Sequence, residues 1–189
     1  MKHQDHVFLL QDGIPPGKDA PLHPVWADFG SGHGAFTLAL AELLGPGGQI
    51  HSVDKDPWAL QRQKEELRAR YPETTVVAHQ ADFTHPLQLP KLHGIVMANS
   101  LHFVAEQYKE NVITLLMSYL HPGGRLILVE YNVDRGNLWV PYPLSFPTWE
   151  KLAQRCGLAS TRLLAKVPSS FLREIYSALS LLPEDSKPS

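Results

Sequence analysis

Short hydrophobic runs alternate with longer amphipathic runs over most of this chain. Glycine or proline stands at most of the junctions, so the runs can be taken as separate elements. Between residues 25 and 130 the pattern predicts buried strands that alternate with helices, which is typical of a mostly parallel sheet covered by helices. The predicted strands are residues 25–29, 49–53, 75–78, 94–98 and 125–130, and the predicted helices are residues 35–44, 58–70, 107–120 and 148–156.

The two ends of the chain have other patterns. Prolines and glycines crowd residues 1–24, which predicts an irregular arm that packs against the domain or, alternatively, covers a ligand. Residues 160–167 and 171–179 predict an antiparallel hairpin, with a helix for the second run as the alternative. Residues 180–189 predict a flexible tail. We therefore expect one domain over residues 25–179, between the arm and the tail.

The most informative segment follows the first predicted strand. Asp28 and Phe29 end this strand, and the sequence Gly-Ser-Gly-His-Gly at 30–34 leads directly into the next helix. Glycine lets the backbone turn tightly and lets a ligand touch the main chain, while the turn directs the N–H groups of the next helix at that ligand. This segment predicts a small-molecule cradle, with a tight turn that holds no ligand as the alternative.

Two cofactor patterns fit this turn. Residues 30–35 satisfy the dinucleotide pattern G-x-G-x-x-A, and residues 28–34 satisfy an acid-led G-x-G-x-G pattern. The pyrophosphate of a dinucleotide is anionic, so the Asp28 carboxylate would repel it. S-adenosylmethionine (SAM) carries a sulfonium and an amino group instead, which suit a carboxylate. At this turn the chain resembles the class I SAM-dependent methyltransferases, of the small, single-domain kind.

Acidic residues also follow the next two predicted strands. Asp54 comes 20 positions after Gly34, the spacing typical of an acid that binds a ribose. The alternative role for Asp54 is to cap the helix that begins near Pro57, for which Asp56 is the better candidate. The pair Asp82-Phe83 matches the position at which the resemblance implies contacts with the adenine amino group and ring. A helix cap is the alternative for that acid.

The resemblance covers roughly residues 25–179 and includes the turn Pro-Gly-Gly at 122–124. It implies a doubly wound α/β fold: a mostly parallel, Rossmann-like, seven-stranded sheet with a C-terminal antiparallel hairpin. It also implies an enzyme that binds SAM and transfers the methyl group by in-line displacement. The implied cofactor-binding residues are Asp28, Phe29, Gly30, Ser31, Gly32, Gly34, Asp54, Lys55, Asp82, Phe83 and Asn99.

Residues after the fourth strand bear on the acceptor. The sequence Asn-Ser-Leu-His at 99–102 lacks the prolines found in enzymes that methylate nucleobase amines or the glutamine of release factors, which favours a small-molecule acceptor and then a protein. His102 is a candidate general base because histidine titrates near neutral pH, with packing beside the cofactor as the alternative.

Tyr131 is a second catalytic candidate. The long aromatic segment 131–147 predicts substrate contacts, with core cover or a dimer contact as the alternative; its candidate substrate residues are Arg135, Trp139 and Tyr142.

Composition and charge narrow the possible kinds of metal site and binding partner. The chain has 189 residues, a formal net charge of −2 and one cysteine, so an internal disulfide framework and a cysteine-rich zinc site are excluded and no metal site is predicted. The near-neutral charge gives no reason to expect nucleic acid or a membrane as partner. We expect a soluble, cytoplasmic protein, with a homodimer as an open alternative. A non-catalytic SAM-binding scaffold and an NAD-dependent oxidoreductase are the alternative functions.

Overall fold

The computed structural model describes residues 1–16 and 21–184, in which strands and helices alternate. The helices are α1 (His3–Leu10), α2 (Ala35–Leu44), α3 (Pro57–Arg70), α4 (Glu106–Met117) and α5 (Phe146–Arg155), with the short 3-10 helices η1 (Gln11–Gly13) and η3 (Leu101–Phe103). The strands are β1 (Val25–Phe29), β2 (Gln49–Asp54), β3 (Thr75–Gln80), β4 (Leu92–Ala98), β5 (Leu120–Tyr131), β6 (Ala159–Pro168) and β7 (Glu174–Leu181).

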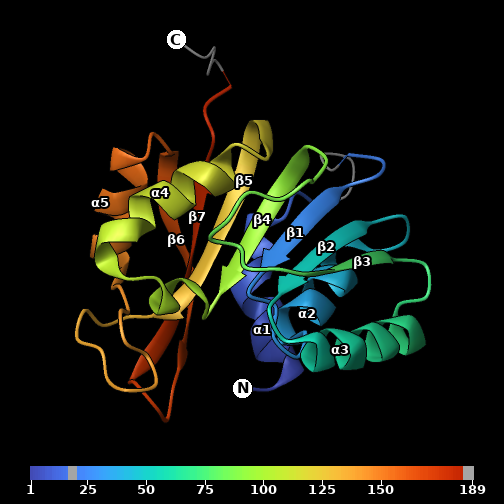
Figure 1. Cartoon of the computed structure of the whole chain (residues 1–189), viewed down its shortest axis with the longest axis horizontal. Coiled ribbons are helices and arrows are strands. Elements are labelled where there is room, and N and C mark those ends of the chain that lie inside the picture. Colours follow the sequence, from blue (N-terminus) through green and yellow to red (C-terminus); the bar gives the residue numbers. More distant parts are fainter. Residues whose placement is uncertain (17–20, 185–189) are drawn as a thin grey trace.

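Within the described residues, the strands form one seven-stranded sheet in the order β3-β2-β1-β4-β5-β7-β6 (Figure 1). Strands β1 to β5 run parallel, whereas β7 is antiparallel to β5 and β6 is antiparallel to β7. The doubly wound sheet with a C-terminal antiparallel hairpin is therefore confirmed, and the second run of the hairpin is a strand rather than a helix.

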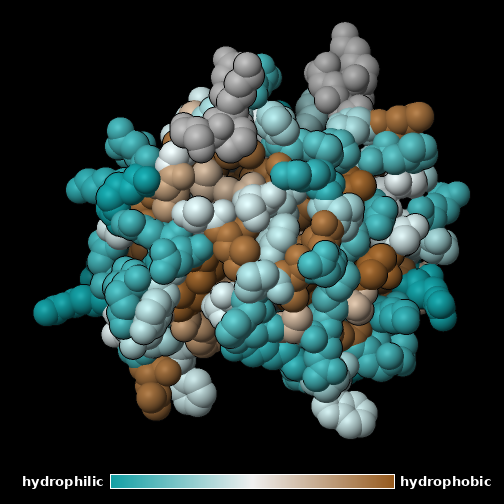
Figure 2. All heavy atoms as spheres, turned by 45° about the horizontal axis from the view of Figure 1, so that its top comes forward, coloured by the Kyte–Doolittle hydropathy of each residue, from teal (hydrophilic) through white to brown (hydrophobic). Residues whose placement is uncertain are grey.

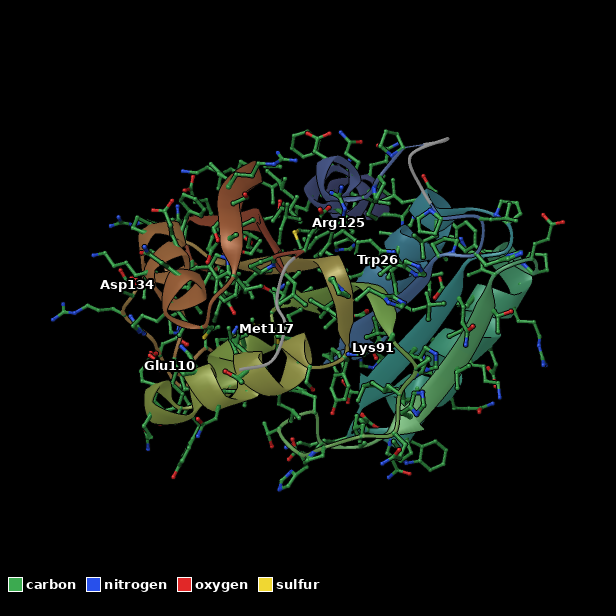
Figure 3. All side chains as sticks on the ribbon, turned by 90° about the horizontal axis from the view of Figure 1, so that it is seen from above. Trp26, Lys91, Glu110, Met117, Arg125 and Asp134 are labelled. Carbon is green, nitrogen blue, oxygen red and sulfur yellow. The ribbon has the colours of Figure 1, made fainter. Side chains whose placement is uncertain are left out.

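Each face of the sheet has its own hydrophobic core, because neighbouring residues of a strand point to opposite faces. Trp26 of β1 packs in one core with Leu9 of α1. Phe29 of the same strand packs in the other core with Trp149 of α5. Figure 3, viewed from above, shows α1 and α4 on opposite sides of the sheet, with Arg125 beside α1.

The N-terminal arm differs from its prediction. Residues 3–10 form α1 rather than irregular chain, because the prolines and glycines that break helices begin only after Leu10. Leu9 and Leu10 are fully buried in the core that α1 shares with α2. This part of the arm therefore packs against the domain, which was the preferred of the two expectations.

Several predicted boundaries were wrong by a few residues. Helix α5 begins at Phe146 with Ser145 at its N-cap position, rather than at Thr148. Ser180 and Leu181 belong to β7, so the predicted tail is wrong for these two residues, and residues 185–189 of that tail lie outside the described residues.

The carboxyl ends of the parallel strands meet at one edge of the sheet, the lower edge in Figure 1. In Figure 2, which brings the opposite end of the molecule forward, hydrophilic residues cover most of the periphery and the hydrophobic surface is broken into small groups. None of the helices in the described part of the chain has the length and apolar composition needed to cross a bilayer.

Candidate functional site

The glycine turn after β1 is held by hydrogen bonds of its own main chain. The N–H groups of Gly30 and Ser31 both donate to the carbonyl of Val53, at 2.9 and 3.1 Å. The N–H of Gly32 donates to Oδ2 of Asp54 at 2.7 Å. These three N–H groups are therefore hydrogen-bonded within the protein and are not free to bind a ligand. What the turn can provide to a ligand is space beside its backbone.

Open space lies beside this turn. Gly32 has a φ of 52°, in the left-handed region that favours glycine, and a Cβ added to it would meet nothing within 4 Å. Gly30 has a φ of 77°, and a Cβ there would lie 2.4 Å from the Cβ of Ser100. The glycines therefore allow β1 to pack closely on the turn after β4 and leave the backbone of Gly32 uncovered by side chains.

A cavity of about 370 Å³ opens where the glycine turn meets the loops after β2, β3 and β4. The sequence predicted six of the residues that line it, namely Gly30, Asp54, Lys55, Asp82, Phe83 and Asn99. The residues that line it without having been predicted are Thr84, Ser100, Phe103 and Val104.

A second cavity, of about 440 Å³, lies near the amino end of β1 beside Trp26 and His93. Prolines and apolar side chains form most of its described lining, and that lining includes no carboxylate. Of these two cavities, the one at the carboxyl ends of the strands is the one lined by carboxylates.

Asp54 is oriented by two main-chain donors. Its Oδ2 accepts from Gly32, and its Oδ1 accepts from the N–H of Asp56 at 2.9 Å. A carboxylate oxygen can accept a second hydrogen bond, so Asp54 keeps acceptor capacity for a ligand's hydroxyl groups. The cap of α3 is Asp56, whose side chain accepts from Trp58 and Ala59, which removes the alternative role proposed for Asp54.

Asp82 is held at the mouth of the same cavity. Its Oδ2 lies 2.8 Å from Nζ of Lys55, and its Oδ1 accepts from both the N–H and the hydroxyl of Thr84. Burial alone would raise the pKa of Asp82, but the hydrogen bonds from Lys55 and Thr84 outweigh it and hold the pKa at about 2. Asp82 is therefore ionised at neutral pH.

Asn99 stands directly after β4 in an uncommon conformation. Its φ is 52°, and its Oδ1 is buried without a donor among the described residues. A non-glycine residue in this region carries backbone strain, and such strain clusters at ligand sites. The buried acceptor fits a ligand that brings a hydrogen-bond donor.

Asp28 does not line the cavity. Its side chain points to the face of the sheet that carries α2, where Oδ2 accepts from the Thr37 hydroxyl at 2.6 Å and Oδ1 has no donor among the described residues. The pKa of Asp28 is raised to about 7, chiefly by burial; the Thr37 hydrogen bond lowers it and the nearby charge of Asp54 raises it. Four further predicted residues lie outside the cavity lining, namely Phe29, Ser31, Gly32 and Gly34.

His102 is buried next to the cavity wall, of which Phe103 is part. Its Nδ1 lies 2.9 Å from both carboxylate oxygens of Glu130, at the end of β5. Since a carboxylate can only accept, we assign the proton to Nδ1, which leaves Nε2 as an acceptor. Nε2 makes no hydrogen bond within residues 1–16 and 21–184.

Tyr131 lies beside His102, with 6.0 Å between the centres of the two rings. Burial, together with the charge of Glu130, raises the pKa of the Tyr131 hydroxyl.

The three predicted substrate residues do not line this cavity. Trp139 is 71% exposed and Tyr142 is 42% exposed, and both lie with Arg135 on the loop between β5 and α5. The root of this loop is pinned, because the buried Lys109 donates to the carbonyl of Tyr142 at 2.6 Å, and the Tyr142 N–H donates to the carbonyl of His102. The loop is therefore anchored to the α4 side of the site while its tip faces solvent.

The site residues that sequence reasoning missed had weak signals. Thr84 follows Asp82 in the order Asp-x-Thr, which is typical of a turn in which the side chain binds the main chain, and this could have been found. Phe103 and Val104 belong to or follow η3, which is too short to show a helical period. Glu130 pairs with His102 only because β4 and β5 are neighbours, and no local pattern shows this.

The donor set fits a cationic, donor-rich nucleoside better than a dinucleotide. Two carboxylates, Asp54 and Asp82, face the cavity against the single ammonium group of Lys55. Asn99 adds a buried acceptor that has no donor among the described residues. An anionic pyrophosphate would meet repulsion here, whereas ribose hydroxyls and amino groups would supply the missing donors.

The comparison with known proteins agrees with a nucleoside-binding cavity. The family model described as a methyltransferase domain matches residues 25–167. The chain belongs to this family. The resemblance to class I SAM-dependent methyltransferases, noted from the glycine turn, is thereby confirmed.

The chain is also similar to named proteins and to solved structures. The chain is 32% identical over 118 residues to a carboxy-S-adenosyl-L-methionine synthase of Chromohalobacter salexigens, a match that covers 60% of this chain and 43% of the relative. It spans less than half the length of the curated relatives it matches. A TehB-like SAM-dependent methyltransferase from Corynebacterium glutamicum shares the fold, with a TM-score of 0.58 and 22% identity over 85% of this chain and 81% of that one. The human N-acetylserotonin methyltransferase, solved in complex with SAM, has a TM-score of 0.63 and 18% identity over 85% of this chain and 48% of that one.

Proposed function

We propose that this protein is a SAM-dependent methyltransferase that methylates a small-molecule acceptor. The observation that carries the proposal is the cavity at the carboxyl ends of the strands, in which Asp54 and Asp82 are already oriented by protein donors. Open α/β sheets bind nucleosides at this place, and the family of the chain consists of methyltransferase domains.

The chain's own residues have distinct roles toward the cofactor in this proposal. Asp54 accepts from the ribose hydroxyls, and Asp82 and Phe83 hold the adenine. Asn99 accepts from the amino group through its buried Oδ1. The turn formed by Gly30 and its neighbours provides room for the tail of the nucleoside. SAM supplies, when bound, a methyl group on a positively charged sulfur.

His102 is the residue we propose to accept the acceptor's proton. Glu130 holds the ring through Nδ1, which fixes the tautomer and leaves the basic Nε2 free. Nε2 would take the proton that the acceptor atom loses when it bonds to the methyl carbon; the carbon–sulfur bond would break in the same step, and its electron pair would stay on sulfur. The neutral Tyr131 hydroxyl beside this pair can donate a hydrogen bond to the acceptor, and the loop with Arg135, Trp139 and Tyr142 covers the acceptor side.

The proposal also covers the class of the acceptor, the compartment, the oligomeric state and the bounds of the catalytic domain. A formal charge of −2 favours neither nucleic acid nor an anionic membrane, which supports a soluble acceptor in the cytoplasm. A protein acceptor is the second choice, and the exposed aromatic side chains of the loop leave a surface for a homodimer. We place the catalytic domain at residues 25–179.

Calorimetric titration of the whole chain tests the cofactor part of the proposal. We expect S-adenosylhomocysteine (SAH) to bind with a micromolar Kd and NAD to give no heat of binding. Binding of NAD without SAH would overturn the proposal in favour of an oxidoreductase. Single-turnover transfer of a labelled methyl group to a member of a small-molecule library separates an enzyme from a non-catalytic SAM-binding scaffold.

A further inference from the structure

A buried amide supports the glycine turn from below. Gln63 is 1% exposed, although it lies in α3 among polar residues that mostly face solvent. Its Nε2 donates to Oγ of Ser31 at 2.9 Å and to the carbonyl of Gly32 at 3.1 Å. Its Oε1 accepts from Oγ of Ser52 at 3.0 Å. Both donors and one acceptor site of the amide are therefore used to join α3, β2 and the turn.

The hydroxyls around this amide form a closed network. Oγ of Ser52 also lies 2.8 Å from Oγ of Ser31, and all three side chains are buried. Buried polar groups without partners cost free energy, so a network in which each member has a partner favours a single arrangement of the turn. The arrangement is also close-packed, because a Cβ added to Gly34 would lie 2.5 Å from the Cβ of Gln63.

Gly32 is held on both sides as a result. Its carbonyl accepts from Gln63, and its N–H donates to the Asp54 carboxylate that lines the cavity. Glycine has the largest backbone freedom of all residues, so a free Gly32 would leave the orientation of this N–H unspecified. The amide of Gln63 removes that freedom at the turn residue whose N–H meets the Asp54 carboxylate.

We infer that Gln63 is a positioning residue for the cofactor: it fixes the Gly32 peptide so that the Gly32 N–H orients Asp54 toward the ribose. The inference rests on the proposed function, because it assigns the cavity to the cofactor. Gln63 lies behind the turn, so it acts on the cofactor through Gly32 and Asp54 and not by direct contact.

The variant Gln63→Met tests this inference, because methionine keeps the volume and removes all three hydrogen bonds. We expect its Kd for SAH, measured by calorimetry at a temperature where circular dichroism shows a folded protein, to rise about tenfold or more. The control Gln61→Met lies on the exposed side of α3, where Gln61 donates to Glu65, and should bind SAH as the wild type does. Ser52→Ala, which removes one anchor of Gln63, should weaken binding less. An unchanged Kd in Gln63→Met would overturn the inference.

Hydrogen exchange separates this inference from the proposed function. We expect the Gly32 amide to exchange faster in Gln63→Met than in the wild type without any ligand, and at the wild-type rate in Gln61→Met. Equal rates in all three proteins would overturn the positioning role even if SAH binds. Failure of the wild type to bind SAH would instead overturn the proposed function, whatever the exchange rates.

Discussion

The proposed cofactor side and the proposed acceptor side of the site are built in different ways. On the cofactor side, Asp54, Asp82 and Gly32 each have two or more protein partners before any ligand arrives. On the acceptor side, Leu138 is 89% exposed and Trp139 is 71% exposed. One side is already organised, whereas the other presents exposed side chains on a pinned loop.

This difference reflects what each side must recognise. A cofactor common to a whole family can be met by a fixed set of acceptors, and preorganised groups lose less entropy on binding. Acceptors differ from enzyme to enzyme, and loops on a rigid scaffold are the usual place for such variation. Mutations on the two sides should therefore have separable effects on SAH affinity and on stability.

The largest effect is expected for Asp54→Ala. The variant removes a charged acceptor for two ribose hydroxyls, and charged hydrogen bonds contribute about 1.5–3 kcal/mol each, so the Kd for SAH should rise about 100-fold. Calorimetric titration measures this. The matched control is Asp56→Ala, which loses the cap of α3 but keeps the cavity, and its Kd should stay within twofold. Equal Kd values for Asp54→Ala and the wild type would contradict the ribose role of Asp54.

Asp28→Asn should change the pH dependence of stability. The folded protein holds the proton of Asp28 up to about pH 7, whereas the ordinary pKa of an aspartate carboxyl is 3.8, so the unfolded state binds fewer protons between these values. The wild type therefore loses stability as the pH rises from about 4 to about 7, by roughly 2 kcal/mol if relaxation halves the full effect of three pKa units. Asparagine has no such dependence.

Thermal unfolding from pH 4 to pH 8 measures this effect. The Tm of Asp28→Asn minus that of the wild type should increase with pH. Parallel Tm curves for the two proteins would contradict the buried, half-ionised state of Asp28.

Glu130→Ala probes the acceptor side. The variant removes a buried charged acceptor from His102 and from the Tyr131 N–H, so the free energy of unfolding should fall by about 1.5 kcal/mol. The Kd for SAH should stay within twofold, because Glu130 is not among the residues that line the cofactor cavity. Urea unfolding and calorimetry measure the two quantities, with the exposed Glu150→Ala as the control for loss of a glutamate. A large loss of SAH affinity would show that the two sides are not separable.

The smallest effect is expected for Trp139→Ala. Because this side chain is largely exposed, its removal should change the free energy of unfolding by less than about 0.5 kcal/mol and leave the Kd for SAH unchanged. Urea unfolding measures the first quantity. A loss of 2 kcal/mol or more would mean that Trp139 supports the fold rather than the acceptor surface.

The cofactor side could be predicted from the sequence because its signals are local. The glycines and the acids each lie within a few residues of a strand end, and parallel strands bring those ends together. The same reasoning placed Asp28 at the ligand, which is not where the structure has it. Its position in β1 points it to the α2 face, and this depends on the register of the strand rather than on its composition.

Other features could not be predicted because they depend on contacts between distant segments. Gln63 looks like one more polar residue of an exposed helix face, and only the packing of α3 on the glycine turn buries it. Glu130 meets His102 through the pairing of β4 with β5. The helix α1 was missed because the breakers that follow it, after Leu10, dominate the composition of the arm.

A crystal structure of the whole chain with SAH tests the central claim most directly. The account predicts both ribose hydroxyls within hydrogen-bond distance of the Asp54 carboxylate, with the adenine beside Asp82 and Phe83. Density for SAH elsewhere on the molecule, or a ribose that leaves Asp54 bonded only to Gly32 and Asp56, would contradict it.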